Sequence, residues 1–213
     1  RHVGQFMKQG ASRHALKDRK HDLYETPAVC VEAAFRAGAF SDAGPVIWEP
    51  CAGRGAIARE LRRFGFSVVA QDLVDYPGRD PDIATGIDVL MEREAPPGAT
   101  AIITNPPFML ADQFIRHGLT LVPNVIVLLR AMAIEGAGRA DLIDNHLREY
   151  WIGIDRPPAM HREGWEGSKL SNSGAPFAWF VFSARPRVAG HRAGVEAMRR
   201  DPIALRRFWW RQG

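Results

Sequence analysis

Cysteine is scarce in this sequence: Cys30 and Cys51 are the two among 213 residues. Two cysteines are too few for a disulfide scaffold, so the composition favours a protein of the reducing cytoplasm. No apolar run approaches the length of a membrane span, and the first residues lack the charged-then-apolar pattern of a signal peptide. We therefore expect no membrane anchor. The seven histidines are scattered without the spacing of metal ligands, so we expect no metal site either.

Basic residues gather at the two ends of the chain. Residues 1–22 carry six Lys and Arg against two acids, and residues 185–213 carry eight against two. Subtraction from the totals of 28 and 24 leaves 14 basic and 20 acidic residues between them. Basic ends on a mildly acidic body suit a polyanion such as nucleic acid, although basic tails can also serve solubility alone. We expect a basic N-terminal arm (1–22), a main domain (23–184) and a basic, aromatic tail (185–213) belonging to the same domain.

Short apolar segments alternate with segments of helical periodicity. Strands are expected near 46–48, 67–70, 101–104, 125–129, 150–154 and 177–182, with a weaker one near 86–89. Helices are expected from Thr26-Pro27 to about Gly38, with Thr26 as N-cap, and near 56–64, 109–121, 137–148 and 202–210. Strands that are almost wholly apolar imply a mostly parallel sheet covered on both faces. Since no helix separates the last two strands, we expect them to pair antiparallel.

A rigid turn, Asn105-Pro106-Pro107-Phe108, follows the apolar run 101–104. The two prolines fix φ and remove two N–H donors, and Pro106 drives Asn105 into an extended conformation. An amide, free backbone carbonyls and an aromatic ring are therefore held together at the end of a strand. An exocyclic amino group needs such a site to act as a nucleophile, because two acceptors take its hydrogens and a ring stacks on its base. Alone, the motif is also consistent with a proline-rich loop that ends a strand.

A second turn, Glu49-Pro50-Cys51-Ala52-Gly53-Arg54-Gly55, joins the first strand to a helix. Its small residues let the backbone turn tightly and approach a ligand, and Asp72, nineteen residues beyond Gly53, is spaced to bind ribose hydroxyls. The turn has no Gly-Lys-Ser/Thr and is not an ATP-type phosphate loop. Glu49 would repel phosphate but suits a ligand with a positive centre. The alternative is a turn that uses glycine for backbone reasons only, with Asp72 as a helix cap.

Together these segments resemble the class I S-adenosylmethionine-dependent methyltransferases, and within them the amino-methyltransferases that modify adenine in DNA. The turn at 49–55 looks like their cofactor motif, and the turn at 105–108 looks like their catalytic Asp/Asn-Pro-Pro-Tyr/Phe motif. Asp22-Leu23-Tyr24-Glu25-Thr26-Pro27 is similar to a segment that touches the cofactor, and the order of the three is similar to the gamma arrangement. The resemblance covers roughly residues 22–182. It implies an α/β, Rossmann-like class I methyltransferase fold, with a seven-stranded, mostly parallel sheet, one antiparallel strand and helices on both faces.

The resemblance also implies roles for individual residues. Catalysis would fall to Asn105, Pro106, Pro107 and Phe108, with Phe108 stacking on the target base. S-adenosyl-L-methionine would be bound by Tyr24, Thr26, Pro27, Glu49, Pro50, Cys51, Ala52, Gly53, Gly55, Asp72, Leu73, Asp88 and Asn105. His161, Trp165 and Lys169 could grip the target or its flanking nucleotides, although a solvated loop explains these three equally well.

The expected function is methyl transfer from S-adenosylmethionine to the N6 amino group of adenine in DNA. The chain is too short for a separate target-recognition domain, so the loop 156–176 and the basic ends would supply recognition. RNA adenine and protein glutamine methyltransferases share the catalytic motif, and a non-catalytic nucleic-acid-binding relative is a third class. The basic ends disfavour a protein substrate but do not separate DNA from RNA, and the oligomeric state stays open. Cys51 is expected to be a small structural residue rather than a nucleophile, and Trp209 and Trp210 either stack on bases or pack a terminal helix on the body.

Overall fold

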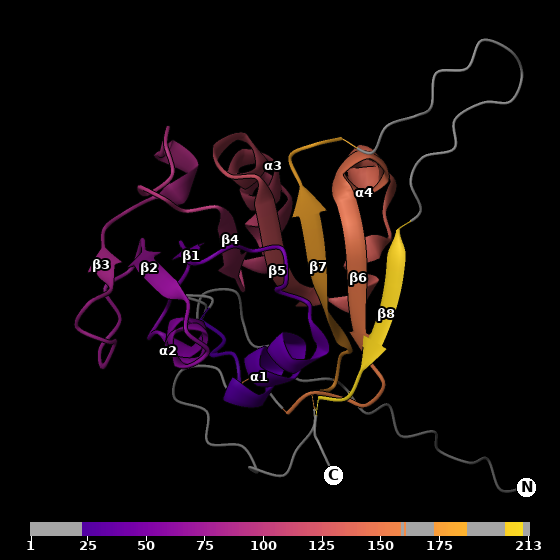
Figure 1. The fold of residues 1–213 in the computed structure, drawn as a ribbon, viewed down its shortest axis with the longest axis horizontal. Helices are drawn as coiled ribbons and strands as arrows, with labels where there is room; N and C mark the ends of the chain where they lie inside the picture. Colours follow the sequence, from indigo (N-terminus) through magenta and orange to yellow (C-terminus); the bar gives the residue numbers. More distant parts are fainter. Residues whose placement is uncertain (1–22, 159, 161–172, 187–202, 211–213) are drawn as a thin grey trace, which may run out of the picture.

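The computed structural model describes residues 23–158, 160, 173–186 and 203–210. They form an eight-stranded sheet in the order β3-β2-β1-β4-β5-β7-β6-β8 (Figure 1). The strands are β1 (Val46–Glu49), β2 (Ser67–Asp72), β3 (Ala84–Thr85), β4 (Ala101–Thr104), β5 (Asn124–Arg130), β6 (Leu147–Gly153), β7 (Phe177–Ser183) and β8 (Ala204–Phe208). The helices are α1 (Ala28–Ala37), α2 (Ala56–Arg63), α3 (Ala111–Leu121) and α4 (Ala140–His146), with 3-10 turns at Val89–Met91, Phe108–Leu110, Ala131–Ile134 and Ala137–Arg139.

Strand direction follows the expected pattern. β7 runs antiparallel to both of its neighbours, β5 and β6, and every other pairing is parallel. The predictions of a mostly parallel sheet with one antiparallel strand, and of antiparallel pairing between the last two predicted strands, are confirmed. The predicted number of seven strands is wrong by one, because β8 extends the sheet beyond β6.

The prediction of a helix over 202–210 is wrong, because this segment supplies β8. Its backbone pairs with β6, which would otherwise leave unpaired N–H and C=O groups at the edge of the sheet. Phe208 and Trp210 are buried whereas Trp209, between them, is 57% exposed. This alternation is the period of a strand rather than of a helix. Gly153 on β6 admits the Trp210 ring, since a Cβ there would collide with the indole.

Three smaller corrections concern element boundaries. The weak strand near 86–89 is instead a two-residue strand, β3, followed by a 3-10 turn, because the Asp88 side chain accepts a hydrogen bond from the Leu90 N–H (3.0 Å). The helix expected over 137–148 is shorter, since its first residues form a 3-10 turn and β6 already begins at Leu147. Thr26 is not the N-cap of α1; Pro27 takes that position without a side-chain cap.

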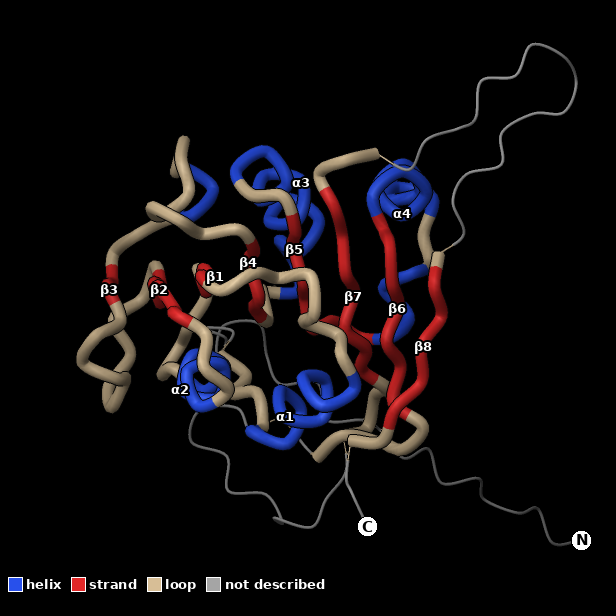
Figure 2. Tube along the Cα trace, in the orientation of Figure 1, coloured by secondary structure: helices blue, strands red, loops and turns tan. Residues whose placement is uncertain are grey.

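Helices cover both faces of the sheet. Figure 2 shows α1 and α2 on one side and α3 and α4 on the other. Adjacent residues of a strand point to opposite faces, so Ile126 packs in the cluster under α1 and α2, and its neighbour Val127 packs in the cluster under α3 and α4. The sheet is thus buried on both sides, as its almost wholly apolar strands require.

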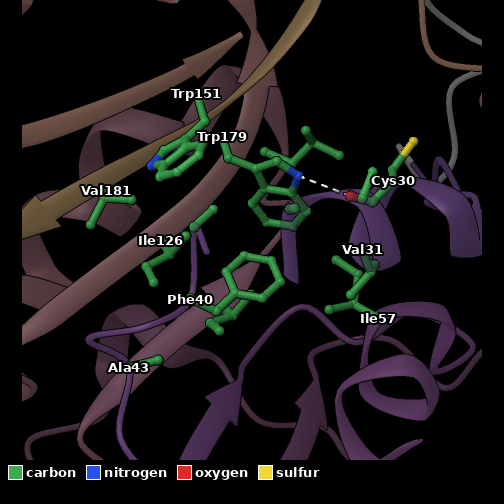
Figure 3. Close-up of a cluster of buried hydrophobic side chains, with 14 of the residues drawn as sticks. Cys30, Val31, Phe40, Ala43, Ile57, Ile126, Trp151, Trp179 and Val181 are labelled. Carbon is green, nitrogen blue, oxygen red and sulfur yellow. Dashed lines mark hydrogen bonds between the residues drawn. The ribbon is translucent and has the colours of Figure 1, made fainter. Parts of the chain in front are cut away.

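Trp179 of β7 lies at the centre of the first cluster (Figure 3). Its ring is fully buried and meets Phe40 edge-on, with centroids 5.1 Å apart. Its indole N–H donates a hydrogen bond to the Cys30 carbonyl of α1 (3.2 Å). Without this bond the buried N–H would have no partner. This contact fixes the start of α1 on the sheet, and the segment that leads into α1 reaches the candidate site.

No helix in the described ranges is both long and apolar enough to cross a membrane. The arm 1–22 and residues 187–202 of the tail lie outside the described residues, so the proposed division of the chain stays a prediction.

Candidate active site

One cavity of about 420 Å³ opens at the carboxyl ends of β1, β2 and β4. Open α/β sheets bind ligands at this edge. Most residues predicted to bind a cofactor line it, namely Tyr24, Thr26, Glu49, Pro50, Cys51, Ala52, Gly53, Asp72, Leu73, Asp88 and Asn105, together with Pro106, Pro107 and Phe108. Pro27 and Gly55 are not among the lining residues. The structure therefore brings five separate sequence segments, at 24–26, 49–53, 72–73, 88 and 105–108, to one cavity, while the role of each residue stays a prediction.

The glycine turn after β1 needs glycine at two positions. Gly53 (φ 57°) and Gly55 (φ 94°) both adopt the left-handed backbone region that other residues disfavour. A Cβ on Gly53 would lie 2.6 Å from the Leu23 side chain, and one on Gly55 would collide with the Asp80 carboxylate. Gly55 therefore shapes the turn from outside the cavity, whereas Gly53 lies on the cavity wall.

Asp72 at the end of β2 holds the glycine turn in place. Its carboxylate accepts hydrogen bonds from the backbone N–H of Gly53 (2.7 Å) and of Val74 (2.8 Å), and the residue is 8% exposed. A carboxylate offers about four acceptor positions, so these bonds are compatible with a further ribose contact. Asp88 lies across the cavity, where its Oδ1 caps the 3-10 turn at Leu90.

Glu49, the last residue of β1, is a buried carboxyl in the cavity wall. It is 1% exposed, and its Oε2 has no hydrogen-bond partner in the described part of the chain. Burial raises the pKa of Glu49 well above 4.5, and the Asp72 carboxylate raises it further, whereas the Ala58 backbone and the Arg62 guanidinium lower it. With the Asp72 and Asp88 carboxylates in its wall, the cavity favours a cation and disfavours a phosphate.

Cys51 sits in the same wall. Burial raises the pKa of its thiol well above 9.0, and the Asp72 carboxylate adds to this. A thiol held in its protonated form is a poor nucleophile. This agrees with the expectation that Cys51 is a small structural residue.

The Asn-Pro-Pro-Phe turn follows β4 as expected and contains no cis peptide among the described bonds. The Asn105 Nδ2 donates to the Tyr24 carbonyl (3.3 Å) and to the Thr26 hydroxyl (3.2 Å). Its Oδ1 is buried and has no hydrogen-bond partner in the described ranges. A buried acceptor left without a donor costs about 1–3 kcal/mol, which a ligand with an N–H group would recover.

Aromatic rings and one cation surround Phe108. Its ring centroid lies 5.8 Å from that of Tyr24 and 6.1 Å from that of Phe177. The guanidinium of Arg130, the exposed last residue of β5, lies 5.5 Å from the same centroid. This corner can hold a flat, electron-rich ring beside a positive charge.

Sequence reasoning missed several residues of the site. Arg130, Tyr76 and Phe114 each lie beside residues singled out in the sequence, but no motif marks them. The position of Arg130 directly after the most apolar strand was a usable signal, since that places it at the ligand-binding edge. His161, Trp165 and Lys169 lie outside the described residues. Within the described ranges no group of three or more His, Cys, Asp or Glu could hold a metal ion.

Comparison with known proteins identifies relatives by fold and not by sequence. No protein-family model and no curated protein matches the chain. A candidate RNA methyltransferase from Pyrococcus horikoshii is similar with a TM-score of 0.52 at 17% identity, over 76% of this chain and 87% of that one. The modification subunit of a candidate type I restriction enzyme from Vibrio vulnificus is similar with a TM-score of 0.52 at 14% identity, over 80% of this chain and 46% of that one, so this chain spans about half its length. The expected Rossmann-like methyltransferase fold is confirmed.

Proposed function

We propose that this protein transfers a methyl group from S-adenosylmethionine to the N6 amino group of adenine in DNA. The observation that carries the proposal is the buried Asn105 Oδ1, which has no partner among the described residues and lies in the wall of an acidic cavity. An acceptor fixed there by two prolines suits an amino group that must lose conjugation with its ring.

S-adenosylmethionine would supply an electrophilic methyl group on a positively charged sulfur. The residues present fit such a ligand, because Gly53 lets the backbone approach it closely and the Asp72 and Asp88 carboxylates favour its charge. Asp72 and Asp88 line the cavity and would accept hydrogen bonds from its nucleoside part.

The chain's own residues would act on the adenine by positioning it. The base leaves its stack and enters the corner beside Phe108, which stacks on it. Asn105 Oδ1 and the Pro106 carbonyl each accept one amino hydrogen, so the nitrogen lone pair turns out of the ring plane and toward the methyl donor. S-adenosylmethionine would supply the methyl group, its C–S bond breaking as the N–C bond forms, and the amino group would release one proton to solvent. Holding the reacting atoms in line is the main contribution of such a site.

DNA is the favoured substrate because of the basic ends, and RNA adenine is the second candidate. The two proteins of similar fold are a candidate RNA methyltransferase and the modification subunit of a candidate type I restriction enzyme, so they support nucleic acid without choosing between polymers. A protein glutamine substrate fits the catalytic turn but not the basic ends. A non-catalytic nucleic-acid-binding relative fits poorly with two complete motifs around one cavity.

Asn105→Ala tests the assignment, with Asn124→Ala as its matched control. Asn124 binds the Asp42 carbonyl at the opposite end of the parallel strands, away from the cavity. Asn105→Ala should lower methyl transfer by at least ~100-fold, while S-adenosylmethionine affinity by calorimetry changes by no more than a few fold. Asn124→Ala should leave both unchanged. Wild-type turnover in Asn105→Ala would refute the proposed chemistry.

A further inference from the structure

Residues 23–26 form a strap across the candidate site. At one end, the Leu23 side chain packs against Gly53 of the glycine turn. In the middle, the Tyr24 ring lies 5.8 Å from the Phe108 ring. At the other end Thr26, which is 4% exposed, binds the Asn105 amide. The strap therefore touches both the proposed cofactor side and the proposed catalytic side of the cavity.

The strap determines which way the Asn105 amide faces. A backbone carbonyl can only accept, so the group that faces the Tyr24 carbonyl must be the NH₂ of the amide. The Thr26 hydroxyl accepts the second hydrogen of the same NH₂. Both donor positions are then used, and Oδ1 is left on the other side of the amide, turned away from the strap.

We infer that Thr26 is a positioning residue: with the Tyr24 carbonyl it holds the Asn105 amide so that Oδ1 presents its lone pairs to the target amino group. This inference rests on the proposed function and deepens it, because it moves Thr26 from cofactor binding to orientation of the catalytic amide. It also accounts for the uncapped start of α1, since the Thr26 hydroxyl is engaged by Asn105 instead of the helix.

The same geometry explains why Asn, and not Asp, stands at position 105. A carboxylate there would bring an oxygen to the Tyr24 carbonyl at about the present 3.3 Å, where two acceptors repel each other. The family motif resembled by this chain admits either residue, but the strap admits only one that carries a donor. The choice of residue is thus set by a contact across 81 positions of sequence.

Thr26→Val and Thr26→Ser separate orientation from cofactor binding. Valine has nearly the same shape without an acceptor, so it should lower kcat about fivefold to tenfold, as expected for one neutral hydrogen bond. Its S-adenosylmethionine dissociation constant should stay within about twofold. Serine keeps the hydroxyl and should keep kcat within about twofold. Thr100→Val is the matched control, because it removes a threonine hydroxyl that makes a hydrogen bond far from the cavity, in this case donated to the Ala43 carbonyl.

Three results would overturn the inference in a preparation whose wild type is active. They are an unchanged kcat in Thr26→Val, a dissociation constant that rises by the same factor as kcat falls, or a Thr26→Ser variant as impaired as Thr26→Val. Asn105→Asp provides an independent check should Thr26→Val not fold. It should lose kcat at neutral pH and recover part of it as the pH falls and the carboxyl gains a proton to donate. An Asn105→Asp variant with wild-type kcat would contradict the inference that the strap orients the side chain at position 105. A wild-type protein that methylates no nucleic acid would instead contradict the proposed function.

Discussion

The Asp72 carboxylate accepts a hydrogen bond from the Gly53 N–H over 2.7 Å and thereby ties the end of β2 to the turn after β1. Asp72→Asn should leave the N–H of Gly53 or of Val74 unpaired, since an amide retains one acceptor oxygen where the carboxylate has two. We expect a loss of about 1–3 kcal/mol in the free energy of unfolding, measured by urea titration, and weaker binding of S-adenosylmethionine.

Asp82→Asn is the control for that experiment. Asp82 pairs with Arg62 at the surface and is 54% exposed, so its loss should cost under ~1 kcal/mol. Equal losses in the free energy of unfolding of the two variants would show that the hydrogen bond to Gly53 stabilises the fold no more than a surface ion pair does.

Glu49 should make stability fall as the pH rises. Its pKa is raised in the folded protein, so the unfolded chain ionises first, from about 4.5 upward, and the folded state loses relative stability until the pH passes the raised pKa. Glu49→Gln removes this titration and should therefore have a higher free energy of unfolding than the wild type near pH 8, but not near pH 4.

Denaturant titrations across this pH range test the sign. Glu32→Gln is the opposite case, because the Arg36 guanidinium holds the pKa of Glu32 below 4.5. The stability that the ionised Glu32 carboxylate contributes is present above that pH and is lost as the pH falls. A difference between Glu49→Gln and wild type that does not grow with pH would contradict a raised pKa at Glu49.

Arg130 should contact the nucleic-acid backbone beside the target base. It is an exposed cation whose guanidinium lies 5.5 Å from the centroid of the Phe108 ring. Arg130→Ala should weaken polynucleotide binding and lower the slope of log affinity against log salt by about 1, because one phosphate contact is lost. Arg36→Ala on α1, where Arg36 pairs with Glu32, should leave the slope unchanged. A slope for Arg130→Ala equal to that of the wild type would exclude the contact.

The end of β8 and the residue that follows it should contribute unequally to stability. Phe208 is buried and its ring lies 4.5 Å from that of Trp210, so Phe208→Ala should cost about 3–5 kcal/mol. Trp209 is largely exposed, and Trp209→Ala should cost under ~1 kcal/mol. Thermal unfolding of the two variants tests this difference in burial, and equal losses of stability would contradict it.

The sheet and the location of the site could be predicted because the sequence encodes both locally. Apolar runs define the central strands, and motifs directly after such runs must lie at the carboxyl edge. Asp72 and the glycine turn illustrate this, since each lies at the end of an apolar strand and the two are joined by a hydrogen bond.

Contacts between distant segments could not be predicted from the residues alone. Thr26 before a proline is typical of an N-cap, yet its hydroxyl binds an amide 79 positions away. The helix predicted over 202–210 was wrong for a related reason. Its Arg and aromatic residues fit a helix, and only pairing with the open edge of β6 makes the segment a strand. The cation beside Phe108 likewise depends on β4 and β5 being neighbours in space.

The most direct test of the proposed function is methyl transfer with labelled S-adenosylmethionine and separate DNA, RNA and protein substrates, followed by digestion of the labelled polymer to nucleosides. The proposal predicts label in N6-methyldeoxyadenosine from DNA, absent from the Asn105→Ala variant and present in Asn124→Ala. Label in N6-methyladenosine from RNA would overturn the choice of polymer. The absence of label from all three substrates, with a folded preparation that binds S-adenosylmethionine, would contradict the proposed function.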